Sequence, residues 1–398
     1  MARNLRSLHL QPTIITIIVI FSFVLLGKFY SGSVNKVNSY SEEANHENNV
    51  HHASTRINEN HRVDLPEVDT QEVPHNGREN ATFITLARNE ELEALLQSID
   101  QVEKRFNKNH HYDWVFFNDN DFTEEFIQRV SERVSGEAKF GKIPDQYWGY
   151  PDFIDQKKAA DTRERMKDVI YGSSESYRFM CRYESGFFWK HPLMDNYRYY
   201  WRVEPDIKFT CDIKDDPFRV LRETGKKYGF TLALYEIPFV VGGLWDATRE
   251  FMEKYPEYIH PHNAIRFARL DGDDQSYNNC HFWSNFEVAD LDFFRSEAYE
   301  AYFNHLDRSG GFFYDRWGDA PVHSLAVSLL MDRNDLHWFK DVGYYHPPFQ
   351  NCPVDPVVRQ ELNCECPNIP DVDPGSWYNF AFESNSCIMD YYIALGRE

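Results

Sequence analysis

The chain has 398 residues, enough for one large domain with a full hydrophobic core. It carries 63 acidic against 42 basic residues, a formal net charge of -21, and this balance argues against nucleic acid as a partner because phosphate backbones need a basic surface. Aromatic residues are abundant, with 31 Phe, 24 Tyr and 9 Trp. They suit either an aromatic-rich core or stacking on sugar rings.

The N-terminus predicts a membrane anchor. Residues 1–9 contain Arg3 and Arg6, and the stretch from Leu10 to Gly27 has no ionisable side chain. As a helix this stretch spans about 27 Å, which suits a thin bilayer of the early secretory pathway. The flanking arginines place residues 1–9 in the cytoplasm, residues 10–29 in the membrane and the rest across it, as in a single-pass type II protein. A cleavable signal peptide is the alternative, but no small-x-small site follows closely.

Residues 30–80 predict a flexible stem. They are rich in Asn, Glu, His and Ser, and no aromatic residue lies between Tyr40 and Phe83. Such a segment cannot bury a core. Asn80, in Asn80-Ala-Thr82, is an N-glycosylation acceptor site at the end of the stem.

Seven cysteines lie on the oxidising side of the predicted anchor, where pairing is expected. Because seven is odd, at least one thiol must be free or intermolecular. Cys364 and Cys366 lack the spacing of a zinc site and are interpreted as disulfide-forming, with partners that the sequence does not specify.

Residues 81–398 are predicted to form one α/β domain. A buried strand over 82–87 and a second over 113–117 alternate with helices over 90–106 and 122–134, which indicates a parallel sheet of the nucleotide-binding type. Further helices are expected over 157–170, 291–306 and from 316–323 to about 331, and further strands over 199–203 and 231–235. Gly310-Gly311 should end the helix over 291–306.

The strand over 199–203 leads directly into two carboxylates. Pro205 cannot donate to a sheet ladder, so the strand should end at Glu204-Pro205-Asp206. Open α/β sheets bind ligands at this edge, and carboxylates there suit Mg²⁺ or Mn²⁺ carrying a diphosphate. A polar turn after the strand is the alternative.

Five longer motifs give the chain a family resemblance. They are Tyr177-Arg-Phe-Met-Cys-Arg-Tyr183, Tyr200-Trp-Arg-Val-Glu-Pro-Asp206, Cys280-His-Phe-Trp-Ser-Asn-Phe-Glu287, Arg316-Trp-Gly-Asp-Ala-Pro-Val-His323 and Tyr344-Tyr-His-Pro-Pro348. The sequence resembles the fungal Golgi α-1,2-mannosyltransferases of glycosyltransferase family 15. The resemblance implies a GT-A fold (a mixed sheet flanked by helices), GDP-mannose as donor, Mn²⁺ as cofactor, a mannose-terminated glycan or glycoprotein as acceptor, and transfer with retention. It also implies a Golgi membrane location with a lumenal catalytic domain.

Carried over by motif, the resemblance assigns roles to individual residues. Glu204 and His346 would hold the metal, Tyr177, Arg182 and Asp206 would contact the donor, and Asp319 and His323 would line the acceptor or donor side. Arg88, at the end of the first strand, is a further candidate for donor binding, but it could equally be a surface arginine. Purely structural roles also fit three of these residues: a turn histidine at His346, a turn cap at Asp206, and a helix N-cap at Asp319 with Pro321 just inside.

Glu287 is the candidate catalytic residue, since the resemblance places it beside the anomeric carbon of the donor. Retention needs either a covalent mannosyl-enzyme or attack from the same face within an ion pair. Retaining glycosidases use a carboxylate nucleophile, which makes Glu287 one possible nucleophile. The alternative is a carboxylate that only hydrogen-bonds substrate hydroxyls.

Two further classes of function compete with the transferase. A glycoside hydrolase of the same compartment also needs two carboxylates, but it needs neither Mn²⁺ nor a nucleotide site. A mannan-binding scaffold would keep the fold without turnover, and the presence of Glu204, Glu287 and His346 counts against it.

Overall fold

The computed structural model describes residues 77–270, 273–366 and 385–396. The chain divides into two units, residues 1–69 and 70–398, and every described residue belongs to the second. The predicted tail, the anchor and the stem up to residue 76 therefore lie outside the described residues. None of the helices in the described part is long and apolar enough to cross a membrane.

A mixed sheet of seven strands forms the centre of the domain, in the order β12-β6-β11-β4-β1-β2-β3. Strands β4, β1, β2 and β3 run parallel to one another, as the alternation of strands and helices predicts. Strand β11 runs antiparallel to both β4 and β6, which makes the sheet mixed. The strands are β1 (Ala81–Leu86), β2 (Asp113–Asn118), β3 (Ala138–Lys142), β4 (Tyr199–Val203), β6 (Tyr228–Phe230), β11 (Phe286–Asp290) and β12 (Leu336–Trp338).

Three smaller sheets accompany the central one. One of them, β14-β13-β5, is formed by a strand that follows Glu204 and two strands from the C-terminal part of the chain. The strands of these sheets are β5 (Lys208–Phe209), β7 (Ala233–Tyr235), β8 (Arg269–Leu270), β9 (Asp273–Tyr277), β10 (Cys280–Phe282), β13 (Tyr344–His346) and β14 (Phe349–Asn351).

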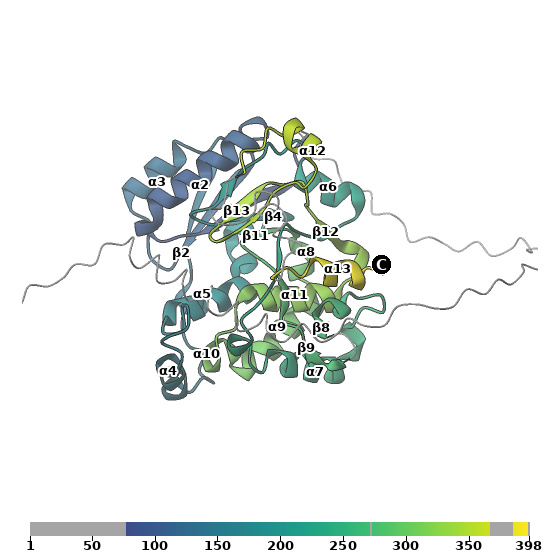
Figure 1. Ribbon diagram of the computed structural model, residues 1–398. Helices are drawn as coiled ribbons and strands as arrows, with labels where there is room; N and C mark the ends of the chain where they lie inside the picture. Colours follow the sequence, from purple (N-terminus) through teal and green to yellow (C-terminus); the bar gives the residue numbers. More distant parts are fainter. Residues whose placement is uncertain (1–76, 271–272, 367–384, 397–398) are drawn as a thin grey trace, which may run out of the picture. The chain divides into compact units, whose positions relative to one another are not determined.

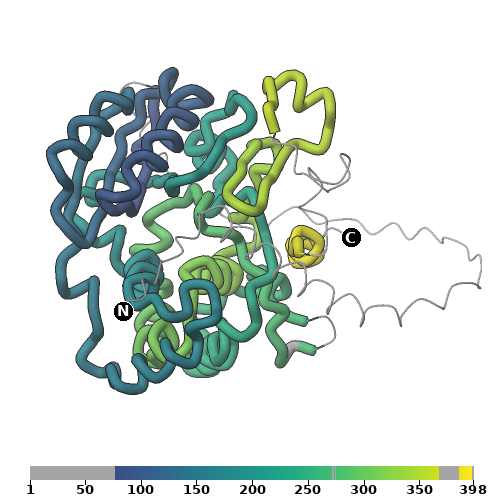
Figure 2. The backbone as a smooth tube through the Cα atoms, turned by 60° about the vertical axis from the view of Figure 1, so that its left-hand side comes forward, coloured from purple at the N-terminus to yellow at the C-terminus, as the bar shows by residue number. Residues whose placement is uncertain are grey.

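Helices cover both faces of the central sheet (Figure 1). The first face is covered by α2 (Leu92–Arg105), α3 (Glu124–Ser131) and α6 (Pro217–Thr224). The second is covered by α5 (Glu175–Gly186), α8 (Leu291–Phe294), α9 (Glu297–Ser309), α10 (Gly311–Tyr314) and α11 (Asp319–Leu330). The remaining helices are α4 (Gln156–Arg165), α7 (Leu244–Lys254), α12 (Pro356–Glu361) and α13 (Ile388–Ala394). In the turned view of Figure 2, α2 and α3 (blue) remain apart from the helices of residues 291–330 (green).

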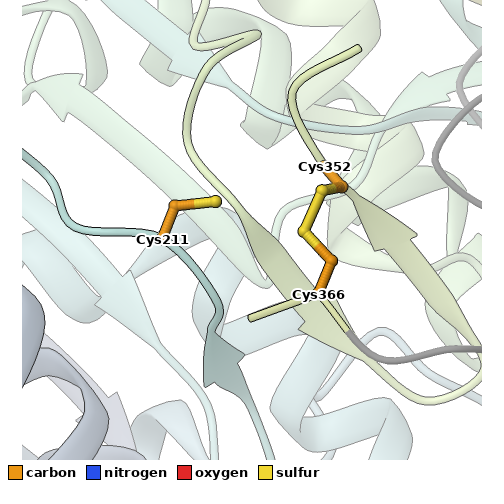
Figure 3. A group of neighbouring side chains, drawn as sticks. All are labelled: Cys211, Cys352 and Cys366. Carbon is orange, nitrogen blue, oxygen red and sulfur yellow. A yellow bond between two sulfur atoms is a disulfide. The ribbon is translucent and has the colours of Figure 1, made fainter. Parts of the chain in front are cut away.

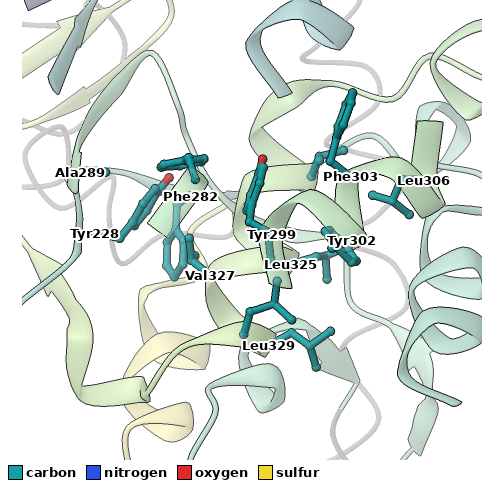
Figure 4. Packing of buried hydrophobic residues seen from close by; sticks show 14 of the residues in the cluster. Tyr228, Phe282, Ala289, Tyr299, Tyr302, Phe303, Leu306, Leu325, Val327 and Leu329 are labelled. Carbon is teal, nitrogen blue, oxygen red and sulfur yellow. The ribbon is translucent and has the colours of Figure 1, made fainter. Parts of the chain in front are cut away.

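Alternating side chains of the strands build a separate core on each face, as expected for a sheet covered on both sides. Phe83, Trp114 and Trp201 pack in the first core, where Phe83 stacks on Trp114 with ring centroids 4.5 Å apart. Tyr200 and Tyr228 belong to the second core, where Figure 4 shows Tyr228 among side chains of β10, α9 and α11. Both cores are rich in aromatic rings. The many Phe, Tyr and Trp residues of the sequence therefore serve, at least in part, to fill the core.

Two of the predicted helices differ most from the observed ones. The helix predicted over 291–306 is broken into α8 and α9, because the Ser296 hydroxyl accepts a hydrogen bond from the Tyr299 amide and caps the second helix. The helix predicted over 157–170 ends at Arg165. Gly310 ends α9 in the left-handed conformation, as predicted.

Three disulfides join distant parts of the domain: Cys211–Cys364, Cys280–Cys387 and Cys352–Cys366. Cys181 is the free thiol among the described residues and is buried. The sulfur atoms of Cys211, Cys352 and Cys366 lie near one another (Figure 3). Because each of them is in a disulfide, this group offers no thiolate to a metal ion. The predictions of disulfides at 364 and 366 and of a leftover cysteine are confirmed.

Candidate active site

Arg202 is the centre of a buried polar cluster at the end of β4. Successive residues of a strand face opposite sides of the sheet, so Tyr200 and Arg202 both face the helices α5 and α11. Glu204 comes two residues after Arg202 and continues this alternation. Nε of Arg202 donates to Oε1 of Glu204 at 2.5 Å, and Nη1 donates to Oδ2 of Asp319 at 2.5 Å. Arg202 therefore connects the acid at the strand end with the first residue of α11.

Asp319 is held as a carboxylate by this cluster. The Ser284 hydroxyl donates to its Oδ2 at 2.6 Å. Burial alone would raise the pKa of Asp319, but the guanidinium of Arg202 brings it down to about 2. The alternative that Asp319 is a helix N-cap is wrong, because Gly318 is the N-cap and Asp319 is the first residue of the helix itself.

Glu184 of α5 also lies next to Arg202. One of its oxygens is 3.9 Å from Nη1 of Arg202. Burial raises the pKa of Glu184 to about 8, against the attraction of Arg202. Glu184 is thus a neutral acid at pH 7, whereas Asp319 is ionised.

The predicted metal ligands are brought together by the pairing of β5 with β13. Tyr345 lies opposite Lys208 in that pair, so His346 comes next to the residues that follow β4. Burial lowers the pKa of His346, while the neighbouring carboxylates of Glu204 and Asp206 oppose this shift. Nδ1 of His346 faces the carbonyl oxygen of Pro347 at 3.2 Å, which leaves Nε2 for a ligand.

This pair fits a divalent metal with few protein ligands. A carboxylate and a neutral imidazole suit Mn²⁺ better than Mg²⁺, which prefers oxygen ligands throughout. Two groups of three potential metal ligands are found in the described part of the chain. Both consist of disulfide cysteines, with one aspartate in the second group, and neither includes Glu204 or His346. The Glu204 and His346 pair would therefore leave most coordination positions to diphosphate oxygens and water.

Glu287 lies on β11 opposite Arg202 and is completely buried, with an exposed fraction of 0%. The Tyr200 hydroxyl donates to Oε1, the Tyr228 hydroxyl donates to Oε2 at 2.7 Å, and Nδ1 of His323 is 2.9 Å from Oε2. Both carboxylate oxygens are thus engaged by donors from β4, β6 and α11.

His323 is the imidazole partner of Glu287. Burial favours a neutral ring, but the Glu287 carboxylate outweighs it and raises the pKa of His323. The second ring nitrogen, Nε2, faces the Glu184 carbonyl oxygen at 3.2 Å. Because both nitrogens face acceptors, the imidazolium form satisfies both contacts.

Tyr177 is in the first turn of α5, and its hydroxyl lies close to Gly318, the residue before Asp319. A Cβ atom on the buried Gly318 would lie 3.8 Å from the Tyr177 hydroxyl and 4.0 Å from a carboxylate oxygen of Glu236. The guanidinium carbon of Arg316 is 5.2 Å from the centroid of the Tyr177 ring, and Nη2 of Arg316 is 3.8 Å from Oε1 of Glu236. Tyr177, Glu236 and Arg316 thus form a second polar cluster that adjoins the first.

The structure separates the two arginines predicted for donor binding. Arg88 is exposed and donates to the Ser176 hydroxyl, one residue before Tyr177, so it lies beside the site. Arg182 is buried instead and makes a two-point ion pair with Asp307 of α9, at 2.7 and 2.8 Å. This pair engages the Arg182 guanidinium within the domain, and the contact of Arg182 with the donor stays a prediction.

The sequence reasoning missed several members of these clusters. The missed residues are Glu184, Tyr200, Arg202, Tyr228, Glu236, Ser284 and Arg316. For Arg202 and Tyr200 a signal existed, because the period of two that runs back from Glu204 puts both on its face of the strand.

Comparisons with known proteins identify the family of the chain. The sequence model of the family described as glycolipid 2-alpha-mannosyltransferase matches residues 33–394. Glycolipid 2-alpha-mannosyltransferase 1 of Candida albicans is 52% identical over 331 residues, which cover 82% of this chain and 75% of that protein. Alpha-1,2 mannosyltransferase KTR1 of Saccharomyces cerevisiae is 52% identical over 319 residues, covering 79% of this chain and 78% of that one.

Solved structures extend the likeness to the fold. Core-mannan synthase A (CmsA/Ktr4) of Aspergillus fumigatus, in its Mn/GDP form, gives a TM-score of 0.73 at 39% identity, covering 82% of this chain and 87% of that one. The mannosyltransferase Ktr4p of S. cerevisiae, in complex with GDP, gives 0.73 at 37% identity, covering 80% and 82%. The family match spans most of the chain, and the chain therefore belongs to the glycolipid 2-alpha-mannosyltransferase family, glycosyltransferase family 15.

Proposed function

We propose that this protein transfers mannose from GDP-mannose to the 2-hydroxyl of a mannose-terminated acceptor, with retention of configuration. The observation that carries the proposal is that the β5–β13 pairing brings His346 near Glu204 beyond the carboxyl end of β4, close to the Asp319 and Tyr177 clusters. Similar proteins carry the name α-1,2-mannosyltransferase, and a related structure contains Mn and GDP.

Glu204 and His346 would hold Mn²⁺, with Asp206 beside them. The ion supplies positive charge to the diphosphate that leaves with GDP. Arg202 keeps Glu204 in place through the 2.5 Å hydrogen bond to Oε1, which leaves the other oxygen of Glu204 for the metal. Arg88 is the cation at the neighbouring strand end and would contact the nucleotide part of the donor.

The reacting sugars would lie between the metal pair and Tyr177. Asp319, ionised at neutral pH, would accept hydrogen bonds from sugar hydroxyls next to the Tyr177 hydroxyl. Its charge is already balanced by Arg202, so it adds orientation rather than net charge. Glu236 and Arg316 extend the polar lining from the same clusters.

For Glu287 we assign a positioning role rather than that of a nucleophile. The Glu287 carboxylate has an exposed fraction of 0%, and its oxygens accept from Tyr200, Tyr228 and His323, so neither oxygen is open to a sugar carbon. It holds His323, and through it α11, in register with β4 and β11. This favours attack within an ion pair on the same face of the donor over a covalent mannosyl-enzyme.

The fold would be of the GT-A type, and the protein would be held in the Golgi membrane by residues 10–29 with the described domain in the lumen. The three disulfides support an oxidising compartment. Asn80 supports it too, because its side chain is exposed and accessible to glycosylation. Residues 77–80, the end of the predicted stem, contact the domain through Glu79, which is buried against Arg222.

The test uses the full chain solubilised in detergent, with GDP-mannose, α-methyl mannoside and Mn²⁺, and NMR of the disaccharide. The expected result is an α-1,2 product that disappears with a chelator and in the Glu204→Gln variant. Release of free mannose from a mannoside without GDP-mannose would favour the hydrolase. Failure to bind GDP-mannose would overturn the proposal.

A further inference from the structure

Tyr171 is an exposed aromatic residue in an unusual backbone conformation. It lies in the turn between α4 and α5, its exposed fraction is 56%, and its φ is 55°. Bulky side chains rarely adopt this left-handed region, and such residues persist only where the surrounding structure holds them.

The turn of residues 166–174 is built to hold this conformation. A Cβ atom on Gly172 would lie 1.9 Å from the Met166 carbonyl oxygen, so only glycine fits there. The Ser174 amide donates to the Tyr171 carbonyl oxygen at 3.0 Å. The buried Arg178 ties the two ends of the turn together, since it donates to the Ser174 carbonyl oxygen at 2.9 Å and approaches Sδ of Met166 at 3.6 Å.

The ring of Tyr171 lies flat on the ring of Tyr177. The two centroids are 4.6 Å apart and the planes differ by 10°. The Tyr177 hydroxyl is directed inward, to the buried Gly318 at the start of α11. Tyr171 therefore covers Tyr177 from the outside, and its remaining surface is open to solvent at the border of the site.

We propose that the exposed face of Tyr171 binds the acceptor, by stacking on the sugar unit that precedes the mannose receiving the transfer. This inference rests on the proposed function and extends it to a subsite. Pyranose rings have apolar C–H faces that pack well on aromatic rings. The diphosphate of the donor would lie at Glu204 and His346, whereas the exposed Tyr171 is on the outer side of Tyr177, where an acceptor chain would lead away to solvent.

The fixed backbone of the turn suits this role. A ring held by its turn loses little side-chain freedom when a sugar stacks on it, so the contact costs less entropy than one with a mobile side chain. A monosaccharide acceptor occupies only the receiving position and does not reach Tyr171. The subsite should therefore affect longer acceptors only.

The test compares α-methyl mannoside with α-1,2-mannobiose as acceptors for the full chain. Tyr171→Asn removes the ring while keeping a residue that tolerates the left-handed conformation. Tyr171→Phe keeps the ring. Ile170→Ala, in the same turn and at a residue that is 46% exposed, is the matched control.

We expect Tyr171→Asn to raise KM for mannobiose roughly two- to tenfold, the range that an aromatic contact supports. KM for α-methyl mannoside and for GDP-mannose should stay at the parent value, and Tyr171→Phe and Ile170→Ala should behave like the parent. An equal loss for both acceptors would show that Tyr171 only supports Tyr177, and would overturn the proposal. So would a change in KM for GDP-mannose alone, or no change at all.

Saturation-transfer NMR of mannobiose on the full chain separates this inference from the proposed function, because it needs no turnover. Magnetisation should reach the non-receiving sugar unit in the parent and be lost in Tyr171→Asn. Equal transfer in both proteins would overturn the subsite even if the parent is an active mannosyltransferase. Inactivity of the parent, with the Tyr171-dependent signal intact, would contradict the transferase and not the subsite.

Discussion

Arg202 on β4 and Asp319 at the start of α11 form a buried ion pair, with Nη1 2.5 Å from Oδ2. The same guanidinium donates to Glu204, so one side chain connects the predicted metal ligand with the helix that carries His323. The geometry of the site therefore depends on the packing of α11 against the sheet.

Asp319→Asn should destabilise the domain by about 1–3 kcal/mol, the cost of weakening a buried charged hydrogen bond, because Glu204 still pairs with Arg202 in the variant. The amide keeps a hydrogen-bond acceptor for Ser284 but leaves Arg202 without this neutralising charge. Chemical denaturation followed by circular dichroism measures the change. Asp335→Asn is the control, because Asp335 pairs with the half-exposed Lys227 and should cost at most about 1 kcal/mol. Equal effects of the two substitutions would contradict the role given to Arg202.

The strand that carries the site was predictable because local signals agree there. Aromatic and β-branched residues favour β4, and the strand ends just before Glu204 and Pro205, as expected. The position of His346 beside Glu204 depends on the pairing of β5 with β13, two short strands far apart in the sequence. No local pattern specifies that pairing, and only the family resemblance pointed to His346.

The buried acids were harder to foresee. Glu184 lies in a helix of mixed polarity, and its environment is created by β4 and α11 rather than by its sequence neighbours. Arg182, two positions earlier, looked equally suited to bind a phosphate, yet it pairs with Asp307 on α9. The partners of the charged residues on this helix are decided by the opposing elements, β4 and α11 for Glu184 and α9 for Arg182.

Removal of either predicted metal ligand should weaken Mn²⁺ binding without unfolding the protein. We expect Glu204→Gln and His346→Ala each to lower the affinity for Mn²⁺ by at least about tenfold in the presence of GDP. Substitution of a residue that only hydrogen-bonds a metal ligand already lowers metal affinity by about that factor. Electron paramagnetic resonance of free Mn²⁺ measures it. His262→Ala, an exposed histidine, is the control. Unchanged Mn²⁺ affinity in both variants would place the metal elsewhere.

The role of Glu287 can be tested by mass spectrometry of the intact protein during turnover. We expect no mannosyl adduct on Glu287 in the parent, and residual transfer in Glu287→Gln. The variant should lose about 1–3 kcal/mol of stability, because an amide NH₂ would face the donors of Tyr200, Tyr228 or His323. A trapped adduct on Glu287, or complete inactivity of the correctly folded variant, would support the nucleophile instead.

Glu184 predicts a pH dependence of stability. The charged and titratable groups that face it are Arg202, Asp319, Glu204 and His323. Its pKa is raised from an ordinary 4.5 to about 8 in the folded protein, mainly by burial. A raised folded pKa means that the protonated form contributes stability that is complete below pH 4.5 and is lost as the pH rises through 8.

Glu184→Gln keeps the shape of the protonated acid and cannot ionise. The stability of the variant relative to the parent should therefore increase between about pH 5 and about pH 8.5, with a slope of at most about 1.4 kcal/mol per pH unit. Urea denaturation at a series of pH values measures the free energy of unfolding of the variant and of the parent. The contributions of the other titrating groups largely cancel when one value is subtracted from the other. A flat profile for Glu184→Gln would mean that Glu184 is already ionised in the folded protein, with Arg202 outweighing its burial.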